Sequence, residues 1–505
     1  MEARAAEEKF VNRDIDGKTY NRNLFVITML IGTFICSLCS TFMTTALPKI
    51  MNSFSISAST GQWLTTGYML VSASMVPLTA VFMEKILTKK LVMFAMLLFG
   101  IGTVICAFSL SFAFLLLGRI IQAIGQGIMM PLIGAVFMMI FPAEKKGTAM
   151  GLIGLTAFVA PAVGPLIAGA VIDRWTWPYM FYILIPFVVL DSILVFLFVE
   201  NVMELKNPKI EVLSIILSTI GLGALLFGFS SAGNRGWSDP VVMISIVMGL
   251  IVFSLFVWRQ LTMEKPMLEL RIFKTKAFAL GTIIGCISNI PYIGVTIILP
   301  LFIQSVLGKP ALTSSLVLLP GALTMAVMTL VAGRLYDRYG VKRLAIPGLI
   351  LLAVSTLPFA DLHINTSLIL IALLHAVRLV GIALVVLPVQ TICLANLPHK
   401  LLPHGSAVLN LTTTGFGSIG VAVLITIMSN VTASHAPAKA LAQTDAALYK
   451  SEMLHAVISG MNTTFMVMIA LTVVSLVIIL FLKEKKQKNT QFKMLVSGRN
   501  GIFKG

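Results

Sequence analysis

Three charged side chains lie inside long apolar stretches of this chain, namely Arg119, Asp191 and Arg378. A charge in the hydrocarbon of a membrane costs about 2.5–3.5 kcal/mol on insertion scales, so such a residue normally faces an aqueous cavity or a partner. A desolvated acid such as Asp191 would hold its proton near neutral pH and release it when hydrated, as exchange of a proton for a solute requires. Two alternatives stay open: Arg119 extends to the headgroups from a helix end, or Asp191 pairs with a neighbouring helix.

A short charged turn separates two further apolar stretches. It contains Gly333, Asp337, Arg338, Gly340 and Lys342. Hydrocarbon excludes such a cluster, so the turn is expected at the water boundary, where glycines permit a tight reversal and the charges can pair. This pattern predicts a conformational role at a membrane surface.

Composition indicates which elements must position these residues. Of the 505 residues, 58% are hydrophobic and 11% charged, which predicts membrane-spanning helices of about 20 residues each. The opening 23 residues mix acidic and basic side chains, so no secretory signal is expected there. Fourteen apolar stretches are long enough, near residues 24–46, 63–83, 91–110, 112–140, 148–171, 178–199, 212–232, 240–258, 277–304, 311–332, 344–360, 367–395, 405–429 and 459–482.

The distribution of basic residues predicts orientation. An even number of spans places both termini on one side, and with the termini inside, 29 of the 37 Lys and Arg fall in inner loops and tails. We therefore expect cytoplasmic termini and a multi-pass protein of the plasma membrane. The net charge of +17 is scattered among short loops rather than gathered on one domain face, so nucleic acid is not an expected partner.

Metal, redox and enzyme chemistry find little support. All five cysteines fall in apolar stretches, and the C-x-x-C formed by Cys36 and Cys39 has no second ligand pair nearby. No H-E-x-x-H, G-x-S-x-G or P-loop pattern occurs. We expect no metal, no cofactor and no enzyme activity.

The two blocks of six spans resemble each other. Arg119 and Arg378 stand 259 residues apart, Gly147 and Gly405 stand 258 apart, and the pairs beginning at Glu84 and Asp337 stand 253 apart. Apolar helices always resemble one another to some degree, but three polar landmarks at nearly one offset favour a true repeat around a midplane site. The predicted divisions are an N-terminal tail (1–23), a six-helix bundle (24–199), two inserted helices with flanking loops (200–276), a second six-helix bundle (277–482) and a C-terminal tail (483–505).

The fifth span carries Pro161, Gly164, Pro165 and Gly169. Small residues four or five apart let helices approach closely, and the prolines remove backbone hydrogen bonds and permit a bend. A purely structural packing role explains this composition as well as a functional one does.

Several motifs together resemble the major facilitator superfamily, in particular its fourteen-helix drug:proton antiporters of the EmrB and QacA type. The pattern is most similar to that of LmrB-like lincomycin exporters of Gram-positive bacteria. The stretches that carry the resemblance, besides the charged turn, are Thr45–Ile50, Gln62–Tyr68, Trp175–Phe181, Pro266–Phe273, Gly405–Ala407 and Gly460–Phe465.

The resemblance implies an all-α major facilitator fold with two pseudosymmetric six-helix bundles plus two extra central helices. It implies proton-coupled efflux of small amphiphilic molecules, such as drugs or antibiotics, by alternating access in a monomer. It makes the proline-glycine pattern of the fifth span the antiporter motif. The substrate cavity that we expect from it is lined by Thr41, Thr44, Gln62, Trp63, Tyr68, Gln122 and Arg378.

The chain departs from that family at one position of the first helix. Many relatives carry an acid or Asn nine residues before the proline that matches Pro48, and here Cys39 stands there. Asp191 is then the candidate proton carrier, and Arg119 and Arg378 favour a neutral or anionic solute. The alternatives are an exporter of an endogenous neutral or anionic metabolite or signalling molecule, and a receptor or scaffold that has lost transport.

Overall fold

The structure is a computed structural model that describes residues 14–56, 58–61, 63–205, 211–438 and 444–482. It contains fourteen helices long and apolar enough to cross a membrane, as the sequence predicts. The spanning helices are α2 (Arg22–Phe54), α4 (Trp63–Lys85), α5 (Thr88–Ala107), α6 (Phe112–Ile140), α7 (Lys146–Arg174), α8 (Tyr179–Phe198), α9 (Val212–Arg235), α10 (Pro240–Thr262), α11 (Lys276–Leu301), α12 (Ala311–Tyr339), α13 (Val341–Thr356), α14 (Leu368–Ala395), α15 (Leu402–His435) and α17 (Ala446–Phe481). A one-turn helix, α3 (Ala58–Gly61), precedes α4.

Polar side chains begin several of these helices. The Asn21 side chain accepts hydrogen bonds from the first amides of α2, and Asp239 does the same for α10, whose first residue is Pro240. Asp445 caps α17 in the same way. Such caps satisfy amides that have no partner within the helix, so each helix can start at the membrane boundary.

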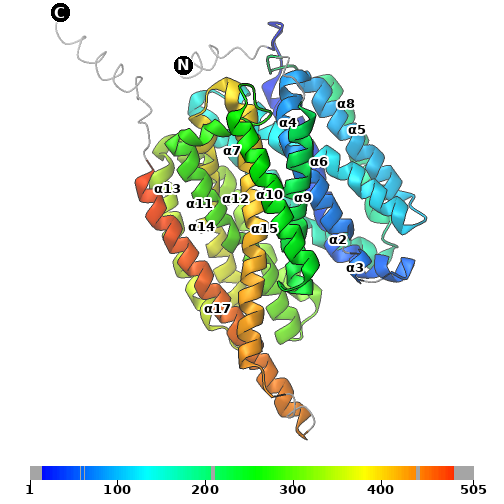
Figure 1. The fold of residues 1–505 in the computed structure, drawn as a ribbon, viewed down its shortest axis with the longest axis vertical. Helices are drawn as coiled ribbons and strands as arrows, with labels where there is room; N and C mark the ends of the chain where they lie inside the picture. The colour runs from blue at the N-terminus through cyan, green and yellow to red at the C-terminus, as the bar shows by residue number, and fades with distance from the viewer. Residues whose placement is uncertain (1–13, 57, 62, 206–210, 439–443, 483–505) are drawn as a thin grey trace, which may run out of the picture.

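The helices run up and down through one bundle (Figure 1). The described chain begins at Asp14 and ends at Leu482 on the same end of this bundle, which we call the terminal face. The opposite end is the distal face. Most of tails 1–23 and 483–505 lies outside the described residues.

Two groups of six helices make up the bundle. In the first group α2 packs on α7 and α8, and α6 on α4 and α5; in the second, α14 packs on α12 and α13, and α15 on α11 and α17. Across the two groups, α7 lies against α12 and α14, and α4 against α15. The α9–α10 hairpin lies on α4 and α15, so it covers one of the two lines along which the groups meet.

The two longest spanning helices, α15 and α17, extend well beyond the hydrocarbon core. At about 1.5 Å per residue, the 34 residues of α15 and the 36 of α17 extend beyond a hydrocarbon core of about 30 Å. Figure 1 shows their ends projecting beyond the distal face.

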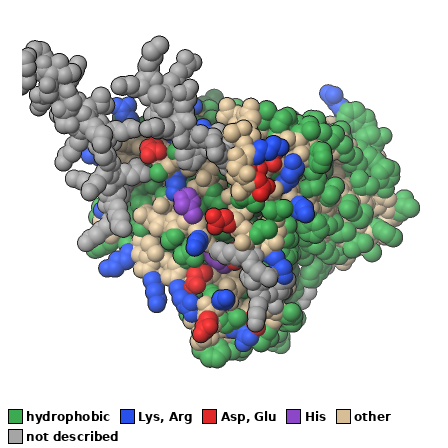
Figure 2. Space-filling view, turned by 90° about the horizontal axis from the view of Figure 1, so that it is seen from above, with side chains coloured by type: hydrophobic (Ala, Val, Ile, Leu, Met, Phe, Trp, Pro, Cys, Tyr) green, Lys and Arg blue, Asp and Glu red, His purple; other side chains and the backbone are tan. Residues whose placement is uncertain are grey.

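Charged side chains gather on the terminal face. Figure 2 shows Lys and Arg spread around this face, with acidic side chains and histidine near its middle and an apolar flank beside it. This arrangement is typical of a protein whose loops meet water and whose sides meet lipid.

Candidate functional site

Arg119 lies deep within the first group and does not reach headgroups. It is fully buried in α6, where its Nη1 donates to Gln122 Oε1 at 3.0 Å and lies 3.4 Å from the Cys39 carbonyl oxygen and 3.5 Å from Cys39 Sγ. Its Nε donates to the Leu64 carbonyl at 3.5 Å, and the ring of Tyr68 covers the guanidinium, with the centroid 3.9 Å from Cζ. Arg119 therefore ties α6 to α2 and α4.

Part of the Arg119 guanidinium stays unsatisfied. Its Nη2 is buried with no hydrogen-bond partner among the described residues. Cys39 stands where the resemblance leads us to expect Asp or Asn, and its side chain offers this cation only a weakly accepting sulfur. The site therefore holds a buried positive charge with a free donor, which suits an acceptor group on a ligand.

Arg378 forms a second site of the same kind in α14. It is fully buried, and its Nη2 donates to the Pro291 carbonyl at 2.6 Å while Nε donates to Thr356 Oγ1 at 3.1 Å. Its Nη1 has no partner in the described structure, and neither has Nδ1 of buried His375, one turn before it. Both arginines of the predicted repeat thus carry a free buried donor.

The edge of the Arg378 site reaches the meeting line of the two groups. Tyr292, the residue after Pro291, contacts Phe158 of α7 edge to face, with ring centroids 5.5 Å apart. This contact joins α11 to α7 near mid-membrane and is half-buried on the Tyr292 side. A ligand held by Arg378 would lie close to a surface that moves if the two groups move.

Asp191 faces protein, not lipid. It is fully buried in α8, and a Cβ added to Gly32 of α2 would lie 2.6 Å from its Oδ2. Met96 and Met129 border the same spot. Neither carboxylate oxygen has a hydrogen-bond partner among the residues described, so the expected alternative, pairing with a neighbouring helix, does not occur. An isolated buried carboxylate is far less costly in its neutral form, and this environment therefore favours the protonated acid.

Asp337 joins the two groups at the terminal face. Its Oδ1 accepts from the Gly147 amide at 2.6 Å, and its Oδ2 accepts from the Thr148 amide and hydroxyl at 2.9 and 2.6 Å. These donors belong to the first turn of α7, where free amides and the helix dipole stabilise an anion. The expected pairing of charges within the turn is therefore replaced by pairing with a helix 190 residues away.

The two glycines of the charged turn have different roles. Gly340, with a φ of 78°, makes the reversal between α12 and α13, as predicted. Gly333 instead lies inside α12, where its Cα packs against the backbone of Gly147 so closely that an added Cβ would collide. The prediction that Gly333 forms part of the turn was wrong, because the sequence signal for close helix contact is the same residue type.

The cations of the turn have other contacts. The Arg338 guanidinium lies 5.2 Å from the centroid of the Tyr339 ring. Lys342 Nζ donates to the Leu480 carbonyl at 2.7 Å near the end of α17. Lys342 thus fastens the α12–α13 turn to the last spanning helix.

A contact between α4 and α15 is the equivalent, in the internal repeat, of the contact that Asp337 makes with α7. His404 Nε2 lies 3.4 Å from Glu84 Oε1, and His404 Nδ1 accepts from the Glu269 amide at 3.4 Å. A neutral imidazole with its proton on Nε2 satisfies both contacts. Nearby, Ser406 Oγ donates to the Pro131 carbonyl at 2.7 Å. Sequence reasoning missed His404, although Glu84 at the offset of Asp337 was a signal that an equivalent contact exists.

The proline-glycine pattern of α7 packs against α2. Gly164 meets Thr41 so closely that an added Cβ would overlap its Oγ1, whereas Gly169 faces open space. The helix continues through Pro161 and Pro165, and the Pro165 side chain lies outside the described part. Gly164 therefore fixes a close contact with α2, and Gly169 lies clear of it.

The remaining cavity candidates are spread over several environments. Trp63 stacks on Phe227 of α9 with centroids 5.7 Å apart, and Tyr68 donates from its hydroxyl to Gln126. Gln122 is fully buried and donates to Thr103 Oγ1 at 2.8 Å, so it points into the first group. Gln62 and the Thr44 side chain lie outside the described residues.

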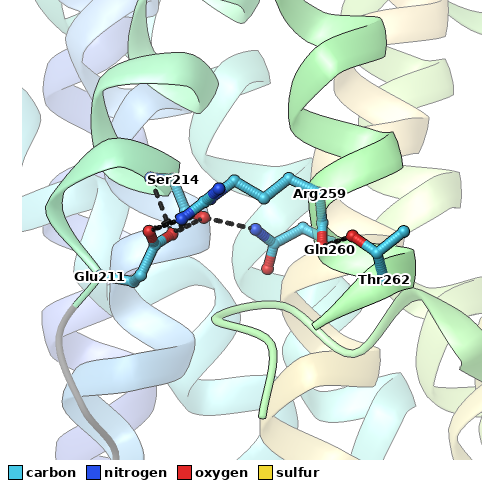
Figure 3. Close-up of polar contacts among 5 residues, drawn as sticks. All are labelled: Glu211, Ser214, Arg259, Gln260 and Thr262. Atoms are coloured by element: carbon cyan, nitrogen blue, oxygen red, sulfur yellow. Dashed lines mark hydrogen bonds and ion pairs between the residues drawn. The ribbon is translucent and has the colours of Figure 1, made fainter. Parts of the chain in front are cut away.

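The inserted hairpin is tied to the terminal face by a polar network (Figure 3). Arg259 Nε donates to both Glu211 oxygens at 3.1 and 3.0 Å, and Gln260 Nε2 donates to Ser214 Oγ at 2.7 Å. The Arg259 hydrogen bonds, helped by Ser214, lower the pKa of Glu211 to about 2 against the opposing effect of burial. Gln260 Oε1 also accepts from the Leu268 amide at 2.9 Å, which connects α10 to the segment that reaches His404.

Among the residues that the structure describes, no group of three His, Cys, Asp or Glu side chains gathers closely enough to hold a metal ion. The chemistry of the site thus rests on the two arginines, Asp191 and the contacts of the terminal face.

Comparison with known sequences places this geometry in a family. A profile described as the Major Facilitator Superfamily matches residues 29–422. The chain is 42% identical over 481 residues to the MFS-type transporter YcnB of Bacillus subtilis, covering 95% of this chain and 99% of that one. It is 39% identical to the lincomycin resistance protein LmrB of Listeria innocua over 91% and 97% of the two chains, and 27% identical to the multidrug export protein EmrB of Escherichia coli over 82% and 81%.

Solved structures show the same fold. The proton:xylose symporter XylE aligns with a TM-score of 0.60 at 13% identity, over 91% of this chain and 96% of that one. The human organic anion transporter MFSD10 aligns with a TM-score of 0.58 at 14% identity, over 90% and 99%. The predicted family, the helical membrane fold and the expectation of a transporter rather than an enzyme are confirmed. The chain belongs to the major facilitator superfamily and is a multi-pass membrane transporter related to the lincomycin resistance protein LmrB and the multidrug export protein EmrB.

Proposed function

We propose that this transporter exports small amphiphilic molecules, drugs or antibiotics among them, in exchange for protons. The names of its relatives support the substrate class, since LmrB is a lincomycin resistance protein and EmrB a multidrug export protein. Proton exchange needs an ionisable group that changes its environment during the cycle.

The buried environment of Asp191 is the observation that supports the proposal most directly. Asp191 is fully buried, and neither of its oxygens has a partner among the described residues, which supply no ion pair to hold it in the charged form. The protonated acid is stable in the described conformation, and water that reaches the α2–α8 contact would favour release of the proton. Because Asp191 packs on Gly32, we expect proton release to be coupled to movement of α2, which also packs on α7.

Alternating access follows from the contacts between the two groups. Two contacts join the groups at the terminal face: Asp337 accepts hydrogen bonds from the first turn of α7, and Glu84 contacts His404. Gly333 packs on Gly147 beside the first of them. These contacts close the terminal face. In the opposite state they must separate, which lets the two groups rock about the midplane. The excess of Lys and Arg in the inner loops and tails supports a cytoplasmic terminal face.

The main alternatives within this function differ in the charge of the substrate, which is either a lipophilic cation or a neutral or anionic solute. Cys39 cannot neutralise a lipophilic cation as an acid would, whereas Arg119 and Arg378 each offer a free donor. These donors favour a neutral or anionic solute, including an endogenous metabolite or signalling molecule. The remaining alternative is a receptor or scaffold without transport.

Transport by purified protein in liposomes tests the proposal. An imposed pH gradient should drive radiolabelled lincomycin, or another neutral or anionic amphiphile from a panel, across the membrane. Asp191→Asn should bind the same compound but not respond to the gradient. Asp361→Asn, a change at an exposed acid, is the matched control and should behave like wild type. Gradient-driven transport that persists in Asp191→Asn refutes the role of Asp191, and no transport of any compound favours the receptor.

A further inference from the structure

A buried glutamine of the inserted hairpin holds the segment that follows the hairpin. Gln260 of α10 is fully buried, and its Oε1 accepts from the Leu268 amide at 2.9 Å while its Nε2 donates to Ser214 Oγ at 2.7 Å (Figure 3). Only an acceptor can meet an amide N–H, so the Leu268 amide fixes which end of the glutamine side chain carries the oxygen. Gln260 thus joins the start of α9 to the residues that precede α11.

A second set of contacts holds the same segment against the end of α10. Arg271 Nη2 donates to the carbonyl oxygens of Leu261 and Met263 at 3.1 and 2.6 Å. Glu269 Oε1 accepts from the Arg271 amide at 3.1 Å, and its other carboxylate oxygen lies 3.6 Å from Arg271 Nη1. The Glu269 carboxylate is therefore held by Arg271, while the Glu269 backbone amide meets α15.

The amide of Glu269 contacts His404 in the first turn of α15. It donates to His404 Nδ1 at 3.4 Å, and His404 is almost fully buried. A ring nitrogen that accepts a hydrogen bond carries no proton, so the imidazole proton lies on Nε2. Nε2 lies 3.4 Å from Oε1 of Glu84, which belongs to α4 in the other helix group. The tautomer that the Glu269 amide selects is therefore the one that can donate to Glu84.

The opposite tautomer of His404 would weaken this contact. With the proton on Nδ1, the lone pair of Nε2 would face the Glu84 carboxylate, and two acceptors would meet at a buried position. The proton on Nδ1 would also face the Glu269 amide, which is itself a donor. The contact between the two helix groups thus depends on one backbone amide, next to the residue that Gln260 holds.

We propose that the inserted hairpin positions His404 to close the terminal face. Gln260 holds Leu268, and the amide that follows selects the tautomer of His404. His404 then donates to Glu84 across the two groups. Gln260 is thus a positioning residue that acts through one peptide and one imidazole. The inference rests on the proposed rocking of the two groups, whereas the tautomer of His404 can be measured without any transport.

Two substitutions of Glu269 test the selecting amide. Its φ of −74° suits proline, so Glu269→Pro removes the amide donor at a compatible backbone angle. Glu269→Ala removes the carboxylate and keeps the amide, so it is the matched control. Gln260→Met removes the hydrogen bond to Leu268 at nearly constant volume. Its control is Thr262→Val, because the Thr262 hydroxyl donates to carbonyls of its own helix.

Nitrogen-15 NMR reports the tautomer. The full-length protein in nanodiscs is labelled at the imidazole nitrogens of its six histidines, and His404→Gln identifies the signals of His404 by their loss. Wild type and the two controls should show Nδ1 without a proton. Because one hydrogen bond shifts such an equilibrium about fivefold, Glu269→Pro and Gln260→Met should each raise the ratio of protonated to unprotonated Nδ1 about fivefold.

Spin labels report whether this tautomer matters for closure. Cysteines at Lys90 and Arg343 place one label on each helix group, at exposed positions of the terminal face. The ratio of closed to open molecules should fall about fivefold in Glu269→Pro and in Gln260→Met, and it should stay as in wild type in the two controls.

Two results overturn the proposal. One is a His404 spectrum in Glu269→Pro that is the same as in wild type. The other is an altered spectrum with an unchanged distance distribution. In the second case, Asp337→Ala in the same labelled protein shows whether the fault lies deeper, because unchanged distances there as well would overturn the rocking of the two groups.

Discussion

Removing the Asp337 carboxylate should open the terminal face. In the closed arrangement this side chain accepts three hydrogen bonds from Gly147 and Thr148, at 2.6, 2.9 and 2.6 Å. Hydrogen bonds to a charged group contribute about 1.5–3 kcal/mol each, but the site is half-buried and water can replace part of them. We therefore estimate a net loss of about 2–3 kcal/mol for Asp337→Ala, which includes the interaction with the helix dipole.

That loss applies to the closed state alone, because the two partners belong to different helix groups. The ratio of closed to open molecules should then fall about 30- to 150-fold. Turnover should fall as well, while insertion into the membrane should be unaffected, because none of these contacts lies within hydrocarbon.

Distances between two spin labels measure this ratio directly. Cysteines at Lys90 and Lys276 place one label on each group at exposed positions of the terminal face, and the five native cysteines are buried. In wild type the distance distribution should show mainly the short, closed separation. Asp337→Ala should add or favour a longer one.

The control removes an acid of the distal side. Asp361 is exposed and pairs with exposed His363, so Asp361→Ala should leave the distance distribution as in wild type. An unchanged distribution in Asp337→Ala, together with wild-type transport, would show that this contact does not hold the terminal face closed.

Two further predictions concern charge, and a third concerns the orientation of the protein in the membrane. Arg378→Ala should lower the transport of anionic solutes at least tenfold in liposomes, and unchanged anion transport would reject a role for this cation in the cavity. Glu211→Gln should lower the thermal unfolding midpoint at pH 7, because the Arg259 bonds depress the pKa of Glu211 to about 2. That contribution is present above the unfolded value of about 4.5 and is lost as the pH falls from there toward 2, so the two midpoints should converge below pH 4 and a constant gap would contradict the assignment. A cysteine replacing Lys90 should react with an impermeant maleimide in inside-out vesicles, and reaction in intact cells would place the terminal face outside.

Much of the fold could be predicted because hydrocarbon imposes a simple rule on sequence. Fourteen apolar stretches became fourteen helices, since a span must satisfy its own backbone. The spacing of Arg119 and Arg378 also identified two positions that the structure buries in the same manner. These signals are local or periodic, and a single sequence carries them.

The contacts between distant helices could not be predicted in the same way. Asp337 was expected to pair within its own turn, and its true partner is the first turn of α7. Gly333 was expected in that turn, and it lies in a helix contact instead. An aspartate and a glycine suit a charged turn as well as a contact between two helices. Only the packing of α7 on α12 decides which of these roles each residue has.

The environment of Asp191 illustrates the same limit. Its position in an apolar stretch was visible in the sequence. That neither oxygen has a partner in the described structure depends on α2 supplying Gly32 at that depth. His404 lay outside every motif considered, because a histidine at the start of a span is ordinary. Its role appears only when Glu84 from the other helix group lies 3.4 Å away.

Simultaneous recording of proton and solute movement is the most direct test of exchange. Liposomes that contain purified wild-type protein and an internal pH-sensitive dye would be given a gradient of lincomycin, or of whichever amphiphile the panel identifies as transported, with no initial pH gradient. We predict that protons move against the direction of the solute and that Asp191→Asn abolishes the proton signal. Movement of the solute by wild type with no accompanying change in internal pH would contradict proton exchange.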